Sequence, residues 1–151
     1  MSDSMRELYE ETILDHNRRP RNFRHHPAGA NRIAHGHNPL CGDELSLSLT
    51  VEDGVIKDIG FDGHGCAIST ASASLMTEAL KGKTVAEAEA LFGKVHAVLT
   101  GANGNEIQSL GKLRVLQGVR GYPMRVKCAS LAWHTLHAAL AQQQDETIST
   151  E

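Results

Sequence analysis

Three cysteines at widely separated positions constrain this chain more than any other feature of its sequence. Cys41, Cys66 and Cys128 are separated by 24 and 61 residues, so they lack the close pairing of a zinc finger or zinc ribbon. If their thiols act together, only a folded domain can bring them together. A length of 151 residues, of which 40% are hydrophobic and 22% charged, fits one compact domain over residues 1–151.

Cys41 lies in a turn-forming segment, Asn-Pro-Leu-Cys-Gly-Asp at residues 38–43, two residues before Asp43. Divalent metals that bind thiolate sulfur also accept carboxylate oxygen. The side chains that could together supply the four ligands of a tetrahedral zinc are Cys41, Asp43, Cys66 and Cys128. Two plainer interpretations stay open at this point. A buried cysteine is commonly a small inert hydrophobe, and Asp43 also suits a turn at the start of a hairpin.

Charge and hydropathy exclude several classes of partner. The net charge is −3 and the two signs are interspersed, so the chain has no basic stripe for nucleic acid or an anionic membrane. No stretch approaches the length of a membrane span, and the N-terminus has no apolar signal-peptide core. We expect a cytoplasmic protein with protein partners. Because cytoplasmic thiols stay reduced, three cysteines favour metal or sulfur chemistry over a disulfide framework.

Hydrophobic periodicity predicts a helix and then strands in the first half of the chain. Apolar residues recur at helical spacing over residues 4–17, and a short strand is expected around residues 31–34. Leucine and valine then alternate with serine and threonine over residues 45–51. An Asp-Gly turn and a returning apolar segment at residues 55–61 complete a β-hairpin with one buried face.

Two helices are expected after the hairpin. Residues 67–81 are rich in alanine, serine and leucine without a helix breaker, which places Cys66 at a helix N-terminus. The backbone N–H groups and the helix dipole favour a thiolate there. A second helix starts at Thr84, where Glu87 completes a capping box, and continues to about Leu99.

The last third of the chain is predicted to be irregular and then helical. Glycines spread over residues 100–122 indicate a long connection around one short element at residues 110–116. A final helix over residues 124–142 carries Cys128 in its second turn, after a proline suited to the first helical position. The polar tail at residues 143–151 is expected to be frayed.

The motifs together resemble the U-type iron–sulfur cluster assembly proteins. The resemblance rests on residues 38–43, on Gly-His-Gly-Cys-Ala-Ile-Ser at residues 63–69 with the helix that follows, and on the third cysteine at a C-terminal helix. It spans nearly the whole chain. It implies an α+β fold in which a small three-stranded antiparallel sheet is packed by about five helices in a single domain. In that fold the three cysteines and the aspartate converge at one end.

Two features resemble the SUF-type branch of this family. Lys127 stands directly before Cys128, where the scaffold branch has a histidine. The connection between Cys66 and Cys128 is also longer than in the scaffold branch. The resemblance to the SUF-type branch implies a zinc-binding partner of a pyridoxal-phosphate cysteine desulfurase, which takes sulfur from the persulfide of that enzyme.

Three functions are therefore weighed. The first is a zinc-dependent, sulfurtransferase-like persulfide carrier that stimulates a cysteine desulfurase and serves downstream SUF scaffold proteins. Cys41 is the expected sulfur acceptor because it lies in a loop, whereas Cys66 and Cys128 are anchored on helices. The second is a scaffold that holds iron or a transient [2Fe–2S] cluster on the same four residues. The third is a structural zinc interaction module, which a long glycine-bearing loop around Cys41 disfavours.

Of the nine histidines, only His64 is expected to border the site. His134 and His137 follow Cys128 by six and nine residues, which places neither on its helical face, so solvated or packing roles are expected. Arg125 and Lys127 could ease thiolate formation at Cys128, but an exposed charge is an equally good interpretation of both.

Overall fold

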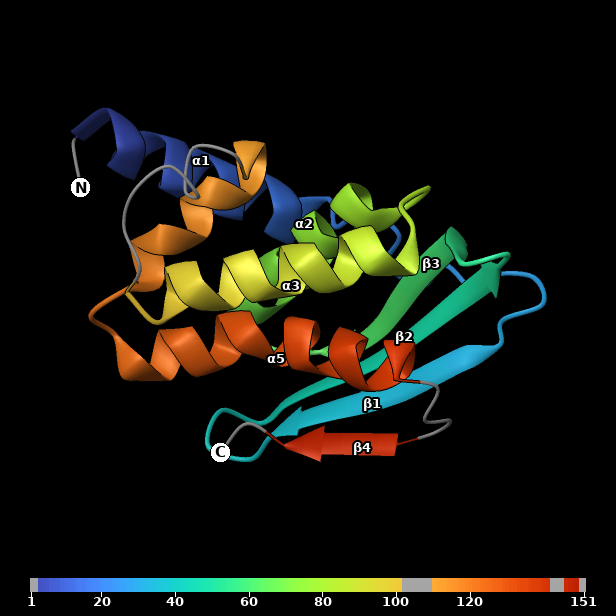
Figure 1. The fold of residues 1–151 in the computed structure, drawn as a ribbon. Coiled ribbons are helices and arrows are strands. Elements are labelled where there is room, and N and C mark those ends of the chain that lie inside the picture. Colours follow the sequence, from blue (N-terminus) through green and yellow to red (C-terminus); the bar gives the residue numbers. More distant parts are fainter. Residues whose placement is uncertain (1–2, 102–109, 142–145, 150–151) are drawn as a thin grey trace.

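The predicted hairpin forms one side of a four-stranded sheet in the computed structural model of this chain (Figure 1). The structure describes residues 3–101, 110–141 and 146–149. The described helices and strands, in chain order, are α1 (Asp3–Arg18), β1 (Arg32–Asn38), β2 (Asp43–Glu52), β3 (Val55–His64), α2 (Ala67–Leu80), α3 (Val85–Leu99), the 3-10 helix η1 (Gly111–Val119), α5 (Pro123–Leu140) and β4 (Glu146–Ser149).

The sheet has the strand order β3-β2-β1-β4. β1 pairs antiparallel with β2 and β2 pairs antiparallel with β3, while β4 runs parallel to β1 at the edge. Leu45, Leu47 and Leu49 are buried along β2, as the alternation in the sequence predicts. The three-stranded antiparallel sheet and the α+β class are therefore confirmed, with β4 as an addition.

Helices cover one face of this sheet (Figure 1). α5 packs on β1 and β2, α2 packs on β3 and on α5, and α1 lies against α2. Trp133 of α5 is fully buried, and its indole N–H donates to the Ser72 hydroxyl over 3.2 Å. Gly36 of β1 lies so close to Leu131 and Thr135 of α5 that a side chain there would collide with them. This close approach fixes where the middle of α5 lies relative to β1.

Local signals in the sequence are confirmed at several elements. Both halves of the capping box at Thr84 and Glu87 are present at the start of α3. Leu75, Met76 and Leu80 of α2 are core residues, as their spacing predicts. Within the part of the chain that is described, no helix is both long and apolar enough to cross a bilayer.

Three expectations need correction. β1 was expected only around residues 31–34 but continues to Asn38, because Gly36 lets the strand pack directly on α5. The loop around Cys41 is consequently short rather than long, with residues 39–42 joining β1 to β2. The tail is not frayed at Glu146–Ser149, because the exposed edge of β1 supplies backbone partners for β4.

Candidate metal centre

The three cysteines come from three different structural contexts at one end of the sheet. Cys41 lies in the β1–β2 turn, Cys66 caps the N-terminus of α2, and Cys128 lies on α5. The Sγ atoms of Cys41 and Cys128 are 3.3 Å apart. One ligand atom each from Cys41, Asp43 and Cys128 lie within 4.8 Å of one another, and Cys66 Sγ is 4.0 Å from Asp43 Oδ2. The fold thus brings the predicted residues together across 87 positions of sequence.

The turn between β1 and β2 presents Cys41 at its tip. The carbonyl of Asn38 accepts hydrogen bonds from the backbone N–H groups of Cys41 (3.2 Å) and Gly42 (2.8 Å). Gly42 has a φ of 72°, a left-handed conformation that a residue with a side chain adopts only with strain. Cys41 itself is exposed, and no heavy atom lies within 4 Å of the position that a Cβ of Gly42 would take.

Asp43 is a fully buried carboxylate that faces the start of α2. Its Oδ1 accepts the backbone N–H of Cys66 over 2.9 Å. Gly65 makes this contact possible, because a Cβ at that position would stand 2.8 Å from Asp43 Oδ1 and 3.1 Å from Ser69 Oγ. Asp43 therefore does more than form a turn, since its hydrogen bond with Cys66 joins the start of β2 to the N-terminus of α2.

Cys66 and Cys128 are held more firmly than Cys41. The Sγ of Cys66 accepts the backbone N–H of Ser69 over 3.4 Å and so serves as the N-cap of α2. Cys128 is buried, and burial raises the pKa of its thiol well above the usual range; the neighbouring Cys41 and Asp43 raise this pKa further. Burial therefore favours the protonated thiol, and a cation beside the sulfur would favour the thiolate.

The donor set fits a thiophilic divalent metal. Three sulfur atoms and one carboxylate oxygen are the ligands that zinc accepts in tetrahedral sites. In the described part of the chain, Asp43 forms no ion pair with a lysine, arginine or histidine. A buried carboxylate without a cationic partner is costly unless a cation is supplied. That these four side chains bind a metal remains a prediction.

The other residues singled out from the sequence lie around this centre or away from it. His64 is exposed and pairs with Glu44 over 3.2 Å, at the surface. His134 and His137 pack against Phe92, with ring centroids 5.6 Å and 4.8 Å from the Phe92 ring. The expectation of packing or solvated roles for these two histidines agrees with this arrangement.

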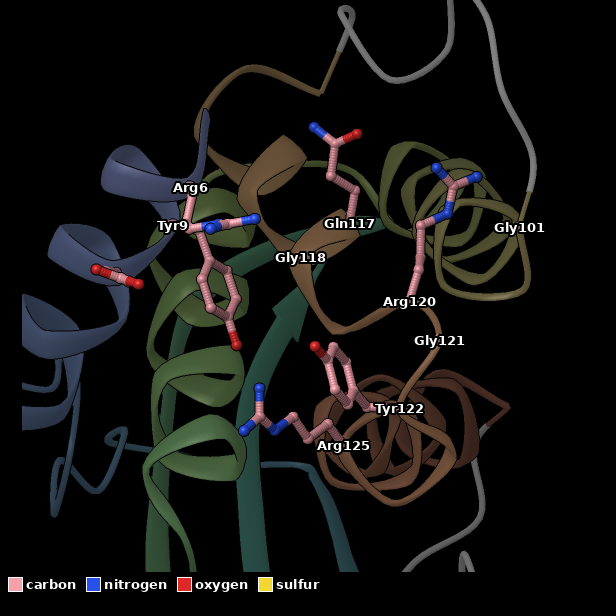
Figure 2. A pocket seen from close by; sticks show the side chains of 10 residues that line it. Arg6, Tyr9, Gly101, Gln117, Gly118, Arg120, Gly121, Tyr122 and Arg125 are labelled. Atoms are coloured by element: carbon pink, nitrogen blue, oxygen red, sulfur yellow. The ribbon is translucent and has the colours of Figure 1, made fainter. Parts of the chain in front are cut away.

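A pocket of about 760 Å³ was not anticipated from the sequence (Figure 2). It lies where α1, η1 and the start of α5 meet, and Arg6, Arg120 and Arg125 contribute its guanidinium groups. The guanidinium of Arg125 stacks on the ring of Tyr122, 4.6 Å from its centroid. Burial raises the pKa of Tyr9, while the charge and hydrogen bond of Arg125 act in the opposite direction. No local pattern could reveal this pocket, because its residues come from three separate segments of the chain.

Comparison with known proteins agrees with this geometry. Residues 8–148 match the family described as the NifU-like N terminal domain. The chain is 35% identical over 137 residues to the zinc-dependent sulfurtransferase SufU of Bacillus subtilis, covering 91% of this chain and 92% of that protein. It is 44% identical over 136 residues to the iron–sulfur cluster assembly scaffold protein IscU of Thermotoga maritima, covering 88% and 92%.

Solved structures give the same result. An iron–sulfur cluster assembly scaffold protein for the SUF system from Fervidobacterium islandicum superposes with a TM-score of 0.78 at 36% identity, over 89% of this chain and 97% of that one. The N-terminal part of a nitrogen-fixing NifU-like protein from Brucella abortus, 23% identical with a TM-score of 0.77, shares the fold. The chain therefore belongs to the NifU-like N-terminal domain family, the U-type iron–sulfur cluster assembly proteins, with SUF-system members among its relatives.

Proposed function

We propose that this chain is a zinc-dependent sulfur acceptor in iron–sulfur cluster assembly, and that it takes sulfur from the persulfide of a pyridoxal-phosphate cysteine desulfurase onto Cys41. The observation that carries this proposal is the contrast among the three cysteines. Cys41 lies in an exposed four-residue turn, while Cys66 caps a helix and Cys128 is buried in one. The similarity to a zinc-dependent sulfurtransferase supports the same function.

The turn allows Cys41 to move without disturbing packed elements. Its neighbour Gly42 has open space around it, and the two turn hydrogen bonds are accepted by a single carbonyl, that of Asn38. Movement of Cys66 would uncap α2 and separate its N–H from Asp43. Movement of Cys128 would shift α5, which packs on the sheet. Cys66 is exposed as well, but its Sγ caps α2, so Cys41 is the exposed thiol that is freer to move toward a partner protein.

Zinc, when bound, would keep the thiolates deprotonated and hold the three segments together. The transfer itself is an exchange between sulfur atoms. The Cys41 thiolate attacks the outer sulfur of the donor persulfide, the donor S–S bond breaks, and the donor cysteine leaves as a thiolate. The new S–S bond carries the transferred sulfur on Cys41. The step involves no net oxidation or reduction, so it needs no further electron donor.

A second function, assembly of a [2Fe–2S] cluster as cargo on the same four residues, is favoured by a different observation. The scaffold protein of Thermotoga maritima shares a larger fraction of its aligned residues with this chain than the Bacillus sulfurtransferase does, at 44% against 35%. Against it stands Lys127, which is half-buried beside Cys128 where the scaffold branch has a histidine.

The experiment supplies a cysteine desulfurase and cysteine to the anaerobically purified, zinc-loaded protein and maps the added sulfur by mass spectrometry of alkylated peptides. We expect the sulfur on Cys41, and we expect Cys41→Ala to abolish acceptance while the fold persists. Ser48→Ala, a half-buried position on β2 away from the cysteines, is the matched control and should accept sulfur normally.

Sulfur found chiefly on Cys66 or Cys128 would contradict the assignment of the acceptor. Metal analysis and the visible spectrum separate the two functions, because zinc is colourless and a cluster is not. A chain that accepts no persulfide at any cysteine, but forms a coloured cluster with iron and sulfide, would replace the sulfur-transfer function by the scaffold function.

A further inference from the structure

Asn38, the last residue of β1, has a fully buried polar side chain beside the candidate metal centre. Its Oδ1 accepts the backbone N–H of Leu40 over 3.2 Å. Because that N–H is a donor, the atom that faces it must be the amide oxygen, and this fixes the orientation of the amide group. The amide nitrogen, Nδ2, is then left buried without a hydrogen-bond partner in the described part of the chain.

The register of β1 against β2 places this amide beside the buried side of the cysteine cluster. Asn38 is directly opposite Asp43 in the β1–β2 pairing, and both side chains are fully buried. Side chains opposed in this way have Cβ atoms about 4.5–5.5 Å apart. Asn38 also lies two residues beyond Gly36 on the inward face of β1, and Gly36 packs on Leu131 of α5. Cys128 is about one helical turn before Leu131, so the amide faces the same end of α5.

An unpartnered buried donor has an energetic cost that the loaded centre can offset. Leaving such a group without an acceptor costs about 1–3 kcal/mol. Three thiolates and one carboxylate carry four negative charges, and a divalent metal neutralises two of them. The loaded centre therefore carries a net negative charge, and two of its ligands, Asp43 and Cys128, are buried like the Asn38 amide. Hydrogen bonds to charged acceptors are roughly twice as strong as those between neutral groups.

We infer that Asn38 is a positioning residue for the loaded metal centre, with its Nδ2 donating to the metal ligands while its Oδ1 holds the turn that carries Cys41. The inference rests on the proposed function only in requiring that the centre takes up a metal. It holds equally for sulfur transfer and for cluster assembly. Groups that orient metal ligands in this way typically change metal affinity 10- to 100-fold when they are replaced.

The test compares Asn38→Asp with a matched control at the other end of β1. Asn38→Asp keeps the shape and the acceptor for Leu40 but replaces the N–H donor by a carboxylate oxygen. The control is Asn31→Asp, because the Asn31 amide donates to the carbonyl of Val51 (2.8 Å) and accepts from its N–H (2.9 Å), away from the cysteines. Zinc affinity is measured by chelator competition, and melting temperature is measured with and without zinc.

We expect Asn38→Asp to lose at least tenfold in zinc affinity and to lower the melting temperature more in the zinc-loaded form than in the zinc-free form. Asn31→Asp should keep zinc affinity within about twofold and shift both melting temperatures equally. Cobalt, loaded in place of zinc, supplies a spectroscopic readout, since its sulfur-to-metal absorption should shift in Asn38→Asp alone. If Asn38→Asp does not fold, Asn38→Ala is measured in its place and should show the same loss of affinity.

Wild-type zinc affinity in both Asn38 variants would overturn the inference, as would equal losses of melting temperature with and without zinc. Either result would mean that Asn38 only stabilises the turn between β1 and β2. A wild-type chain that takes up no zinc would instead overturn the proposed zinc function, and the inference with it. The two failures are therefore distinguishable.

Discussion

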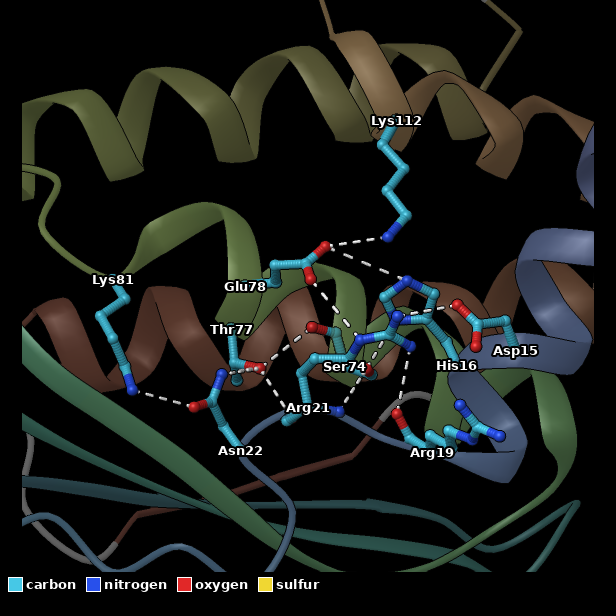
Figure 3. Close-up of polar contacts among 10 residues, drawn as sticks. All are labelled: Asp15, His16, Arg19, Arg21, Asn22, Ser74, Thr77, Glu78, Lys81 and Lys112. Atoms are coloured by element: carbon cyan, nitrogen blue, oxygen red, sulfur yellow. Dashed lines mark hydrogen bonds and ion pairs between the residues drawn. The ribbon is translucent and has the colours of Figure 1, made fainter.

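The polar cluster between α1 and α2 and the cysteine cluster at the β1–β2 turn each combine buried and exposed side chains, but their charges are partnered differently. In the first, the ring of His16 is fully buried and its Nδ1 lies 2.6 Å from the Ser74 hydroxyl (Figure 3). The carboxylate of Glu78 pairs with Lys112 over 3.0 Å and with Arg21 over 3.6 Å. The charges of this cluster are balanced by groups of the chain itself.

The cysteine cluster has no such internal balance. Its groups are a carboxylate and three thiols, and its buried amide, that of Asn38, has no acceptor among the residues that the structure describes. Only a cation from outside the chain would balance the charge of the ionised ligands. The comparison teaches that burial alone does not distinguish a structural polar cluster from a binding site. What distinguishes them is whether the charges of the cluster are balanced without a ligand, because a buried nitrogen without a hydrogen-bond partner occurs in both, His16 Nε2 in the first and Asn38 Nδ2 in the second, among the described residues.

The largest expected difference between the two regions is their response to zinc. A ligand at a thousandfold excess over its Kd adds about 4 kcal/mol to the free energy of unfolding. For a chain of this size that corresponds to a rise of about 8–16 °C in melting temperature. Calorimetry measures the rise, and hydrogen exchange should show added protection at the start of α2 rather than around His16. Asp43→Asn should reduce the gain, and identical melting temperatures with and without zinc would contradict the prediction.

Replacing His16 should have a smaller effect, and one confined to stability. In His16→Ala the buried ring is lost and the Ser74 hydroxyl loses a partner, so we expect a loss of about 2–4 kcal/mol. Urea denaturation measures this loss, and zinc affinity should stay within about twofold of wild type. Leu14→Ala is the control on the same helix, since Leu14 is 51% exposed and its truncation should cost less than about 0.5 kcal/mol. A loss of zinc affinity in His16→Ala would show that the two clusters are not energetically independent.

The smallest expected effect is the pH dependence of the His16 cluster. Burial, together with the charges of Lys112 and Arg21, lowers the pKa of His16 from 6.5 to about 4. Between these two values the unfolded chain binds more protons than the folded chain, so stability falls as the pH decreases through this range. We expect a loss of about 2 kcal/mol between pH 7 and pH 5. Zinc-free protein is used because protons also compete for thiolates. Equal pH slopes in wild type and His16→Ala would refute this origin.

Elements with local signals were predictable from the sequence, whereas long-range contacts were not. The alternation along β2 and the capping box at Thr84 are local, and both appear as predicted. The second half of β1 was missed because its histidines and Gly36 give no strand pattern of their own. That segment is a strand because it pairs with β2 and β4 and because Gly36 allows it to pack on α5. The burial of His16 was likewise invisible, since its partner Ser74 is 58 positions away.

The candidate site divides in the same way. The resemblance of the motifs around Cys41, Asp43 and the other two cysteines to a known family predicted their convergence at one end of the fold, whereas their spacing alone left other interpretations open. The role of Asp43 in holding the N–H of Cys66 required a structure, because it depends on how closely Gly65 approaches the carboxylate. The unpartnered amide of Asn38 could not be predicted, since Asn-Pro is an ordinary turn sequence.

The Sγ atoms of Cys41 and Cys128 lie 3.3 Å apart in the folded chain, but the two residues are far apart in sequence. This separation determines when during synthesis the pair can form. The 87 positions between them take about 4–17 s to translate at about 5–20 residues per second. During that interval Cys41 has left the ribosome's catalytic centre while its partner thiol does not yet exist. The hairpin and α2 can form early, but the pair of sulfur atoms can be completed only near the end of synthesis. The full set of ligands can therefore bind a metal only late in translation or after it.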